Sequence, residues 1–141
     1  MPTIPTITKV LETALYVQDH ARSVTFYERV LGFTKTFEDE RLVALNIADT
    51  KQILLLFLVG SSNQPNPAPG GTIPAHDAKG RMHLAFAIPE SEREAWEAKL
   101  NAENVPLEST VTAQYGGISL YFRDPDGHLI ELATPGVWDV Y

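Results

Sequence analysis

A glutamate stands inside an otherwise apolar strand near the end of the chain. The segment Ile118 to Pro135 is predicted to form two short strands joined by a tight turn at residues 124–127, Asp-Pro-Asp-Gly, which are residue types that favour turns. Side chains alternate along a strand, so Glu131 lies on the face opposite Ile130 and Leu132. A buried carboxylate without a partner is very costly, so Glu131 should meet a cation, a hydrogen-bond donor or water.

Two further polar residues occupy matching positions on other predicted strands. Residues 12–17, Glu-Thr-Ala-Leu-Tyr-Val, overlay on residues 83–88, His-Leu-Ala-Phe-Ala-Ile, and residues 53–60 overlay on 129–136. Glu12 and His83 are equivalent under this overlay, and Leu55 stands where Glu131 stands. If both halves curve around one centre, an imidazole and two carboxylates meet in a cavity.

One imidazole and two carboxylates on rigid strands suit a divalent metal ion with open coordination positions. Oxygen-rich ligation favours Fe²⁺ or Mn²⁺, with Zn²⁺ or Ni²⁺ as alternatives. Each residue alone has an ordinary interpretation, because a strand histidine is usually hydrogen-bonded in the core and a strand glutamate usually faces solvent. The pattern by itself leaves both interpretations open.

The elements that must position these residues follow the order βαβββ twice. We expect the second helix to begin with a capping box, Ser91 to Glu94, and the first to run from an Asp19 cap to Gly32. The expected fold class is α+β, with two βαβββ modules in tandem forming a curved, cavity-enclosing mixed sheet and helices outside. We expect a single domain with four parts: a first module at 9–59, a linker or lid at 60–80, a second module at 81–135 and an apolar tail at 136–141.

Composition excludes several classes of protein. The 141 residues carry a formal net charge of −7, which argues against a nucleic-acid partner. No run of about 18 apolar residues predicts a membrane span, and the N-terminus has no secretory pattern. The chain has no cysteine, so thiolate ligands and disulfides are excluded. We expect a cytoplasmic protein, with which that composition is compatible.

Three stretches resemble a known family: residues 12–33, containing Glu-Thr-Ala-Leu-Tyr-Val and Phe-Tyr-Glu-Arg-Val-Leu-Gly-Phe, residues 83–89, and residues 121–132, Tyr-Phe-Arg-Asp-Pro-Asp-Gly-His-Leu-Ile-Glu-Leu. With the doubled βαβββ order, the chain resembles the vicinal oxygen chelate superfamily, which groups glyoxalase I, fosfomycin-resistance thioltransferases, extradiol dioxygenases, methylmalonyl-CoA epimerases and bleomycin-binding proteins. The resemblance implies metal ligands on the first and last strands of each module, at Glu12, Leu55, His83 and Glu131. It also implies a substrate that chelates the metal through two neighbouring oxygens.

Departures from the family pattern narrow the expected activity. Leu55 cannot ligate a metal, so the four-ligand pattern of glyoxalase I and the epimerases is broken. We therefore rank these two activities below the others in the family. Three-ligand dioxygenases and fosfomycin enzymes usually have His where this chain has Glu12, and fosfomycin enzymes typically have Thr where it has Ala14. We therefore expect a metal-dependent dioxygenase or a lyase/isomerase. The alternative is a metal-free small-molecule binding protein of the bleomycin-resistance type. The resemblance also implies a homodimer, and whether Glu12 joins the site within one chain or across the dimer stays open.

Five more residues are candidates for binding substrate or for catalysis. Alternation along their strands places Tyr16 and Phe57 on the face that is expected to form the cavity, so both should line it. Tyr121 and Arg123 neighbour Glu131 and could orient an oxyanion; the alternative is a core tyrosine and a solvated arginine. His76 in the linker could act as an acid or base, because an imidazole titrates near neutral pH, although loop histidines are more often only solvated.

Overall fold

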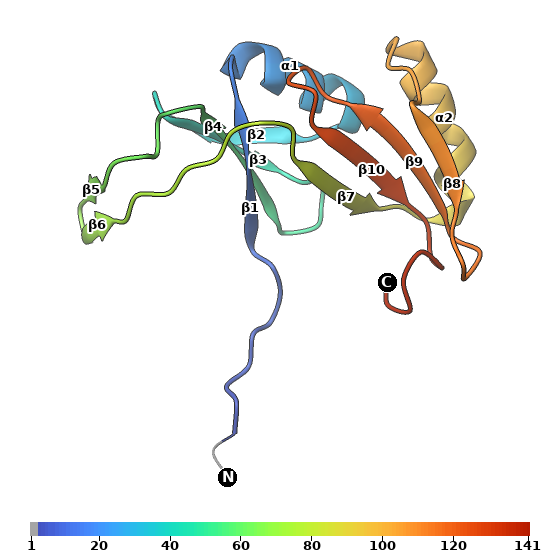
Figure 1. Ribbon diagram of the computed structural model, residues 1–141, viewed down its shortest axis with the longest axis horizontal. Helices are drawn as coiled ribbons and strands as arrows, with labels where there is room; N and C mark the ends of the chain where they lie inside the picture. Colours follow the sequence, from blue (N-terminus) through green and yellow to red (C-terminus); the bar gives the residue numbers. More distant parts are fainter. Residues whose placement is uncertain (1–2) are drawn as a thin grey trace.

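The computed structural model describes residues 3–141 and contains two four-stranded mixed sheets (Figure 1). The first sheet has the order β1-β4-β3-β2 and the second has the order β7-β10-β9-β8, so each repeats the same topology. The first module comprises β1 (Glu12–Val17), α1 (His20–Leu31), β2 (Thr34–Glu38), β3 (Leu42–Asn46) and β4 (Ile53–Leu58). The second comprises β7 (His83–Ala87), a 3₁₀ turn (Glu90–Glu92), α2 (Arg93–Ala102), β8 (Ser109–Thr112), β9 (Ile118–Arg123) and β10 (Leu129–Ala133). The α+β fold of two βαβββ modules predicted from the sequence is confirmed.

The strand register repeats between the modules. In the first sheet, β1 runs parallel to β4 and places Ala14 beside Leu55. In the second sheet, β7 runs parallel to β10 and places Ala85 beside Glu131. The sequence overlay therefore describes real structural equivalence, with Leu55 at the position that Glu131 holds in the second module.

The two helices begin in different ways. The Asp19 side chain accepts a hydrogen bond from the Arg22 amide, and Gly32 ends α1 with a φ of 73°, as predicted. The predicted Ser91–Glu94 capping box is wrong. The chain enters α2 through the 3₁₀ turn, and no side chain caps either segment. The Glu92 amide donates to the Pro89 carbonyl instead, so the backbone takes the place of the serine cap.

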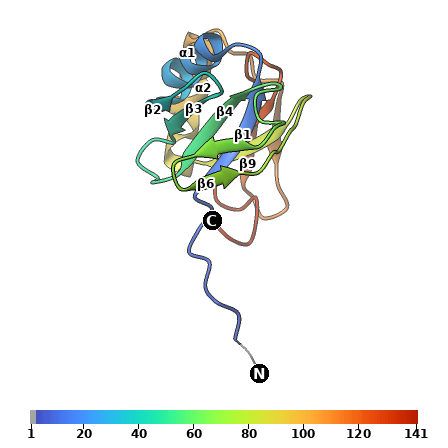
Figure 2. The same cartoon turned by 90° about the vertical axis from the view of Figure 1, so that its left-hand side faces the viewer.

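Residues 60–80 contain a short hairpin of β5 (Asn66–Ala68) and β6 (Gly71–Ile73). Figures 1 and 2 show this hairpin projecting from the first module on the side away from the second sheet. The chain then returns to the first sheet, where the His76 amide donates to the Ser62 carbonyl at 2.9 Å. The segment is thus tied to the first module before it reaches β7.

A buried polar joint holds the two modules together. His128 lies in the β9–β10 connection, is 1% exposed, and donates through Nε2 to the Tyr16 carbonyl of β1 at 2.7 Å. Its Nδ1 accepts from the Met82 amide at 2.9 Å. In the same turn, Asp126 accepts from the Gln18 amide and from the Ser23 hydroxyl. These contacts give the β9–β10 connection, and His128 within it, a structural role between the modules.

Both chain ends leave apolar side chains uncovered. Residues 3–11 extend away from the body (Figure 1), and Ile4 and Ile7 are exposed there. Trp138 and Tyr141 in the predicted apolar tail are also exposed in the single chain. Over residues 3–141, none of the helices has the length and apolar character needed to cross a membrane.

Candidate metal centre and the cavity on the first module

The open face of the second sheet carries the residues that the sequence singled out. On β10, Ile130 and Leu132 are buried in the core, and alternation sends Glu131 to the opposite face. The register places Tyr121 of β9 directly beside Glu131. His83 opens β7, and its imidazole ring lies 6.3 Å from the Tyr121 ring. Neighbouring strands therefore bring an imidazole, a carboxylate and a phenol to one surface.

The His83–Glu131 pair has the geometry of an incomplete cation site. His83 Nδ1 lies 2.9 Å from the Leu129 carbonyl oxygen, and because a carbonyl only accepts, Nδ1 carries a proton. In a neutral imidazole, Nε2 then presents a lone pair, and it lies 3.2 Å from Glu131 Oε1. Two acceptors face each other, so either a metal ion binds the pair or a proton makes the imidazole cationic.

A hydroxyl holds the second carboxylate oxygen in place. The Ser119 hydroxyl donates to Glu131 Oε2 at 2.5 Å, and both residues are buried. The His83 side chain is half exposed, which leaves the pair open on one side. Histidine ligands of metals usually donate their other N–H to a carbonyl, and carboxylate ligands are usually hydrogen-bonded as well. The surroundings of His83 and Glu131 match that pattern, so these residues fit a divalent metal.

Glu12 lies at the start of β1 and is exposed. It lines a cavity over the first sheet and a smaller one between β1 and β7. Over residues 3–141 of one chain, no three His, Asp or Glu side chains come together as a metal-binding group. The structure thus brings His83 and Glu131 together, and it leaves Glu12 apart from them within a single chain.

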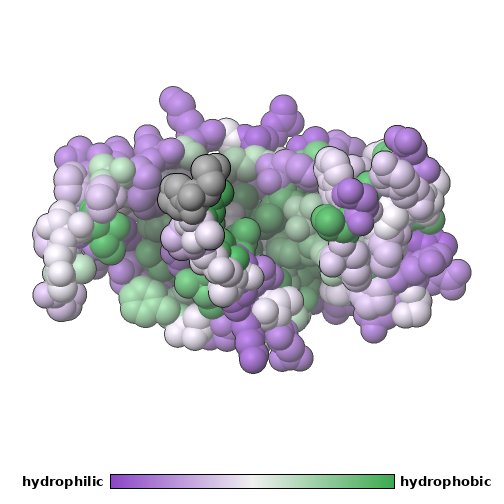
Figure 3. All heavy atoms as spheres, turned by 90° about the horizontal axis from the view of Figure 1, so that it is seen from below, coloured by the Kyte–Doolittle hydropathy of each residue, from purple (hydrophilic) through white to green (hydrophobic). Residues whose placement is uncertain are grey.

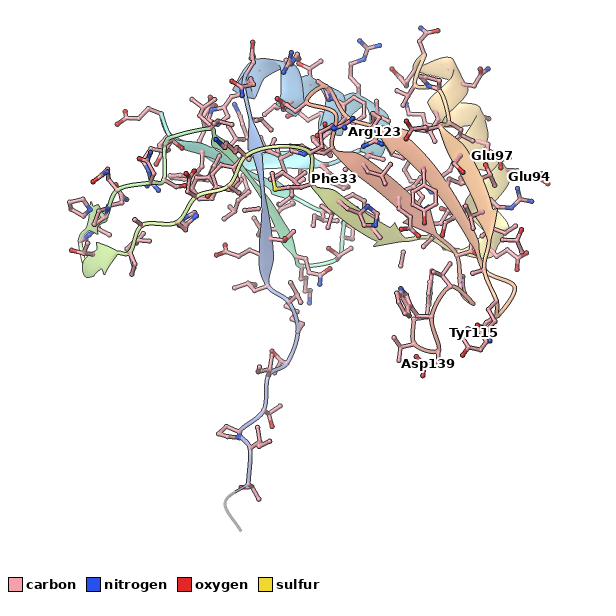
Figure 4. All side chains as sticks on the ribbon, viewed as in Figure 1. Phe33, Glu94, Glu97, Tyr115, Arg123 and Asp139 are labelled. Carbon is pink, nitrogen blue, oxygen red and sulfur yellow. The ribbon has the colours of Figure 1, made fainter. Side chains whose placement is uncertain are left out.

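Arg123 is engaged in structural contacts. Its guanidinium bonds to the Glu108 carboxylate through Nε and Nη2 and to the Gly127 carbonyl through Nη1, all at 3.0 Å. Figure 4 shows Arg123 at the end of β9, beside the β9–β10 turn. These contacts brace the turn and use three of the five N–H donors of the guanidinium. Tyr121, which lies beside Glu131, is the better placed of the two candidates.

The other three predicted residues gather on the first module. Tyr16 and Phe57 are neighbours on β1 and β4, and their rings stack at 5.5 Å. The His76 ring contacts Phe57 edge-on, with ring centres 4.9 Å apart, and Nδ1 lies 2.6 Å from the Tyr16 hydroxyl oxygen. Phe57 and His76 line a cavity of about 570 Å³ together with Glu12. Seen from below, the surface between the two modules is hollowed and largely apolar (Figure 3).

Three side chains that were not predicted from the sequence also belong to these candidate sites. Ser119 is two residues before Tyr121 on β9, so both side chains lie on the same face of the strand. This alternation could have predicted that Ser119 lies near Glu131. Arg41 precedes β3, lines the first-module cavity and lies 5.9 Å from the Phe57 ring centre. Ser62 contacts both Tyr16 and His76, and no local pattern marks it because the fold of residues 60–80 decides its position.

Comparisons with known proteins agree with this architecture. Residues 9–132 match the family described as the Glyoxalase/Bleomycin resistance protein/Dioxygenase superfamily. The chain is 32% identical over 124 residues to a protein of Staphylococcus saprophyticus named Metallothiol transferase FosB, with coverage of 87% of this chain and 74% of that protein. A solved structure titled Lactoylglutathione lyase from Agrobacterium tumefaciens has a TM-score of 0.85 and 28% identity, and the match covers 96% of this chain and 99% of that one. FosX from Listeria monocytogenes has a TM-score of 0.66, 20% identity and coverage of 92% and 94%, so it shares the fold.

Proposed function

The chain belongs to the Glyoxalase/Bleomycin resistance protein/Dioxygenase superfamily, and on that premise we propose that it is a metal-dependent enzyme. Its substrate would be a small molecule that chelates a divalent metal through two neighbouring oxygens. The observation that carries the proposal is that His83 Nε2 and Glu131 Oε1 face each other at 3.2 Å, an arrangement that a metal ion bound to both atoms would explain. With Glu12 as a third ligand the set would be rich in oxygen and would suit Fe²⁺ or Mn²⁺, with Zn²⁺ or Ni²⁺ as alternatives.

Each neighbouring side chain has a definite task in this proposal. A metal ion bound there would act as a Lewis acid toward the substrate oxygens. His83 and Glu131 would hold it, and Ser119 would keep the carboxylate oriented through its 2.5 Å hydrogen bond. Tyr121, beside Glu131 on β9, would donate to an oxygen on which charge develops. The small side chain of Ala85 leaves room for the substrate.

Glu12 would complete the metal site from a second copy of the chain. Within one chain, residues 3–141 supply only His83 and Glu131 to a common point, and the face that carries them is open. The matching strand position on the first module presents Glu12, which is exposed and borders a cavity. A homodimer that sets the first sheet of one copy against the second sheet of the other would join these ligands.

Metal analysis tests this proposal. Protein purified without chelator should carry about one transition metal ion per chain. The substitutions His83→Gln and Glu131→Gln should abolish this binding, because each removes one of the two facing ligands. Glu40→Gln, in the exposed β2–β3 turn, is the matched control and should keep the metal. Full metal content in both ligand variants would refute the site.

A second assay distinguishes a dioxygenase from a lyase or isomerase and from a binding protein. Catechols supplied with Fe²⁺ should consume oxygen if the enzyme is a dioxygenase. Isomerisation of 2-oxo acids with Mn²⁺, without oxygen uptake, would identify a lyase or isomerase. A protein that binds these compounds equally well after metal removal, and converts none, would instead be a binding protein of the bleomycin-resistance type.

Thiol transfer is the second candidate, favoured by 32% identity to the metallothiol transferase FosB over most of this chain. Glu12 and Ala14 count against it, because the resembling fosfomycin enzymes have His and Thr at these positions. Incubation with a thiol, fosfomycin and Mn²⁺ tests this candidate directly. Formation of an adduct between the thiol and fosfomycin would identify the protein as a thiol transferase.

A further inference from the structure

His76 closes a ring of hydrogen bonds with two buried hydroxyl groups. The Ser62 Oγ lies 2.6 Å from the His76 carbonyl oxygen, and the Tyr16 hydroxyl lies 2.7 Å from Ser62 Oγ and 2.6 Å from His76 Nδ1. Tyr16 is 5% exposed and Ser62 is 2% exposed, so water does not replace these contacts. The ring joins β1 to both ends of the 60–80 segment.

The directions of these hydrogen bonds follow from proton counting. The His76 carbonyl only accepts, so the Ser62 hydroxyl uses its one proton there. The Tyr16 hydroxyl must then be the donor in its contact with Ser62, which uses its one proton. Neither hydroxyl has a proton left for the imidazole, so the contact between Tyr16 and His76 is donated by Nδ1–H.

The ring of hydrogen bonds therefore selects one tautomer of His76. With the proton on Nδ1, a neutral imidazole carries its lone pair on Nε2. Across residues 3–141, Nε2 has no protein hydrogen-bond partner, and the residue is exposed at the cavity over the first sheet. The backbone is held as well, because the His76 amide donates to the Ser62 carbonyl at 2.9 Å. A loop histidine is thus fixed as a base that faces a cavity.

The cavity around His76 favours a particular kind of ligand. Most of its lining is apolar, including Phe57, and its volume of about 570 Å³ admits a small organic molecule. The charged groups that line it are Arg41 and Glu12. Within residues 3–141, the Arg41 guanidinium forms no ion pair and donates only to the Ser61 carbonyl, so its charge is available to an anion.

We propose that His76 is a general base that ionises a weakly acidic hydroxyl group, a phenol or an enol, on an otherwise apolar ligand in this cavity. The O–H bond of the ligand breaks, its electron pair stays on oxygen, and a new N–H bond forms at His76 Nε2. The imidazolium keeps its Nδ1–H donated to Tyr16, and Arg41 offsets the negative charge on the ligand. This proposal deepens the proposed function, because an ionised oxygen is the better chelator of a metal. That last link rests on the proposed homodimer, which would set this cavity against the His83–Glu131 metal site of the other copy.

Nitrogen NMR of the metal-free protein tests the tautomer. The His76 ring should show a protonated Nδ1 and an unprotonated Nε2. In Tyr16→Phe the acceptor is lost, so the signal should move toward the other tautomer, and Ser62→Ala provides the same test should Tyr16→Phe fail to fold. His20, whose Nε2 lies 3.0 Å from the Leu56 carbonyl, is the internal reference with a proton on Nε2. A proton on Nε2 of His76 in the unaltered protein would overturn the proposal.

Binding of 4-nitrophenol to the metal-free protein tests the base, because absorbance distinguishes the phenol from the phenolate. The bound probe should be enriched in phenolate. His76→Asn keeps a donor toward Tyr16 but removes the base, and should lower affinity roughly tenfold, the factor that one charge-assisted hydrogen bond supplies. His20→Asn should bind as the unaltered protein does.

The possible outcomes separate His76 from its neighbours and from the metal site. If the bound probe were no longer enriched in phenolate in Glu12→Gln, but stayed enriched in His76→Asn, Glu12 would be the base and the proposal would be overturned. The proposal would also be overturned if Glu12→Gln and His76→Asn both bound the phenolate as tightly as the unaltered protein does. Both measurements are made without metal, so their failure leaves the His83–Glu131 metal site untouched. Conversely, a failed metal analysis leaves the His76 result standing.

Discussion

The Tyr27 hydroxyl offers a direct test of the joint between the modules. Tyr27 lies on α1, is fully buried, and donates to Asp124 Oδ2 at 2.7 Å, in the connection that follows β9. Asp124 is 5% exposed, and its other oxygen accepts from the amides of Asp126 and His128. The substitution Tyr27→Phe keeps the ring and removes only the donor to a buried carboxylate.

The expected loss of stability follows from that single contact. A hydrogen bond to a charged group contributes roughly 1.5–3 kcal/mol, so Tyr27→Phe should lower the free energy of unfolding by about 2 kcal/mol near neutral pH. For a domain of this size, that corresponds to a fall in Tm of about 5 °C. Urea denaturation followed by circular dichroism measures it, and the m-value should be unchanged because the surface exposed on unfolding is the same.

The pH dependence adds a second, independent signature. Burial, and then the nearby Asp124 carboxylate, raises the pKa of Tyr27 well above its ordinary value of 10.0. Since the folded protein holds this proton more tightly, Tyr27 contributes stability below about pH 10 that is lost as the pH rises above it. The stability difference between the unaltered protein and Tyr27→Phe should therefore narrow above pH 10.

A matched control separates this effect from the general behaviour of tyrosines. Tyr115 is 64% exposed in the loop after β8 (Figure 4), so Tyr115→Phe should change stability by less than about 0.5 kcal/mol. Equal stabilities of Tyr27→Phe and Tyr115→Phe would refute the reasoning. A constant gap between Tyr27→Phe and the unaltered protein through pH 11 would show that the Tyr27 proton is not held by burial.

Two further predictions concern the second sheet. In Gly117→Ala the new methyl would lie 2.2 Å from the Val137 amide nitrogen, so thermal melting should show a loss of about 1–3 kcal/mol, whereas Gly70→Ala meets nothing within 4 Å and should melt normally. Ser119→Ala removes the donor to Glu131, and should weaken metal binding by at least roughly tenfold in calorimetric titration with Mn²⁺. Unchanged affinity would show that Ser119 does not orient the carboxylate.

The sequence alone determined the repeated module and the face on which each polar strand residue lies. Alternation with a period of two sets the face of Glu131 once Ile130 and Leu132 enter the core, and the register then repeats from one module to the next. The turn at 124–127 and the ends of α1 followed from residue types with strong local backbone preferences. These properties depend on neighbours close in sequence, which is why a single sequence reveals them.

The partners of each functional group were decided only by the tertiary structure. Arg123 bonds to Glu108, and His76 is held by Tyr16, sixty positions away in the chain. The sequence overlay made Glu12 equivalent to His83, but equivalence by pseudo-symmetry does not place two residues at one point. The two sheets are not hydrogen-bonded to each other, but they share one hydrophobic core and the polar contacts around His128, so the distance between their open faces depends on how they pack together. Docking is set by packing and hydrogen bonds between residues remote in sequence, and no local pattern records it.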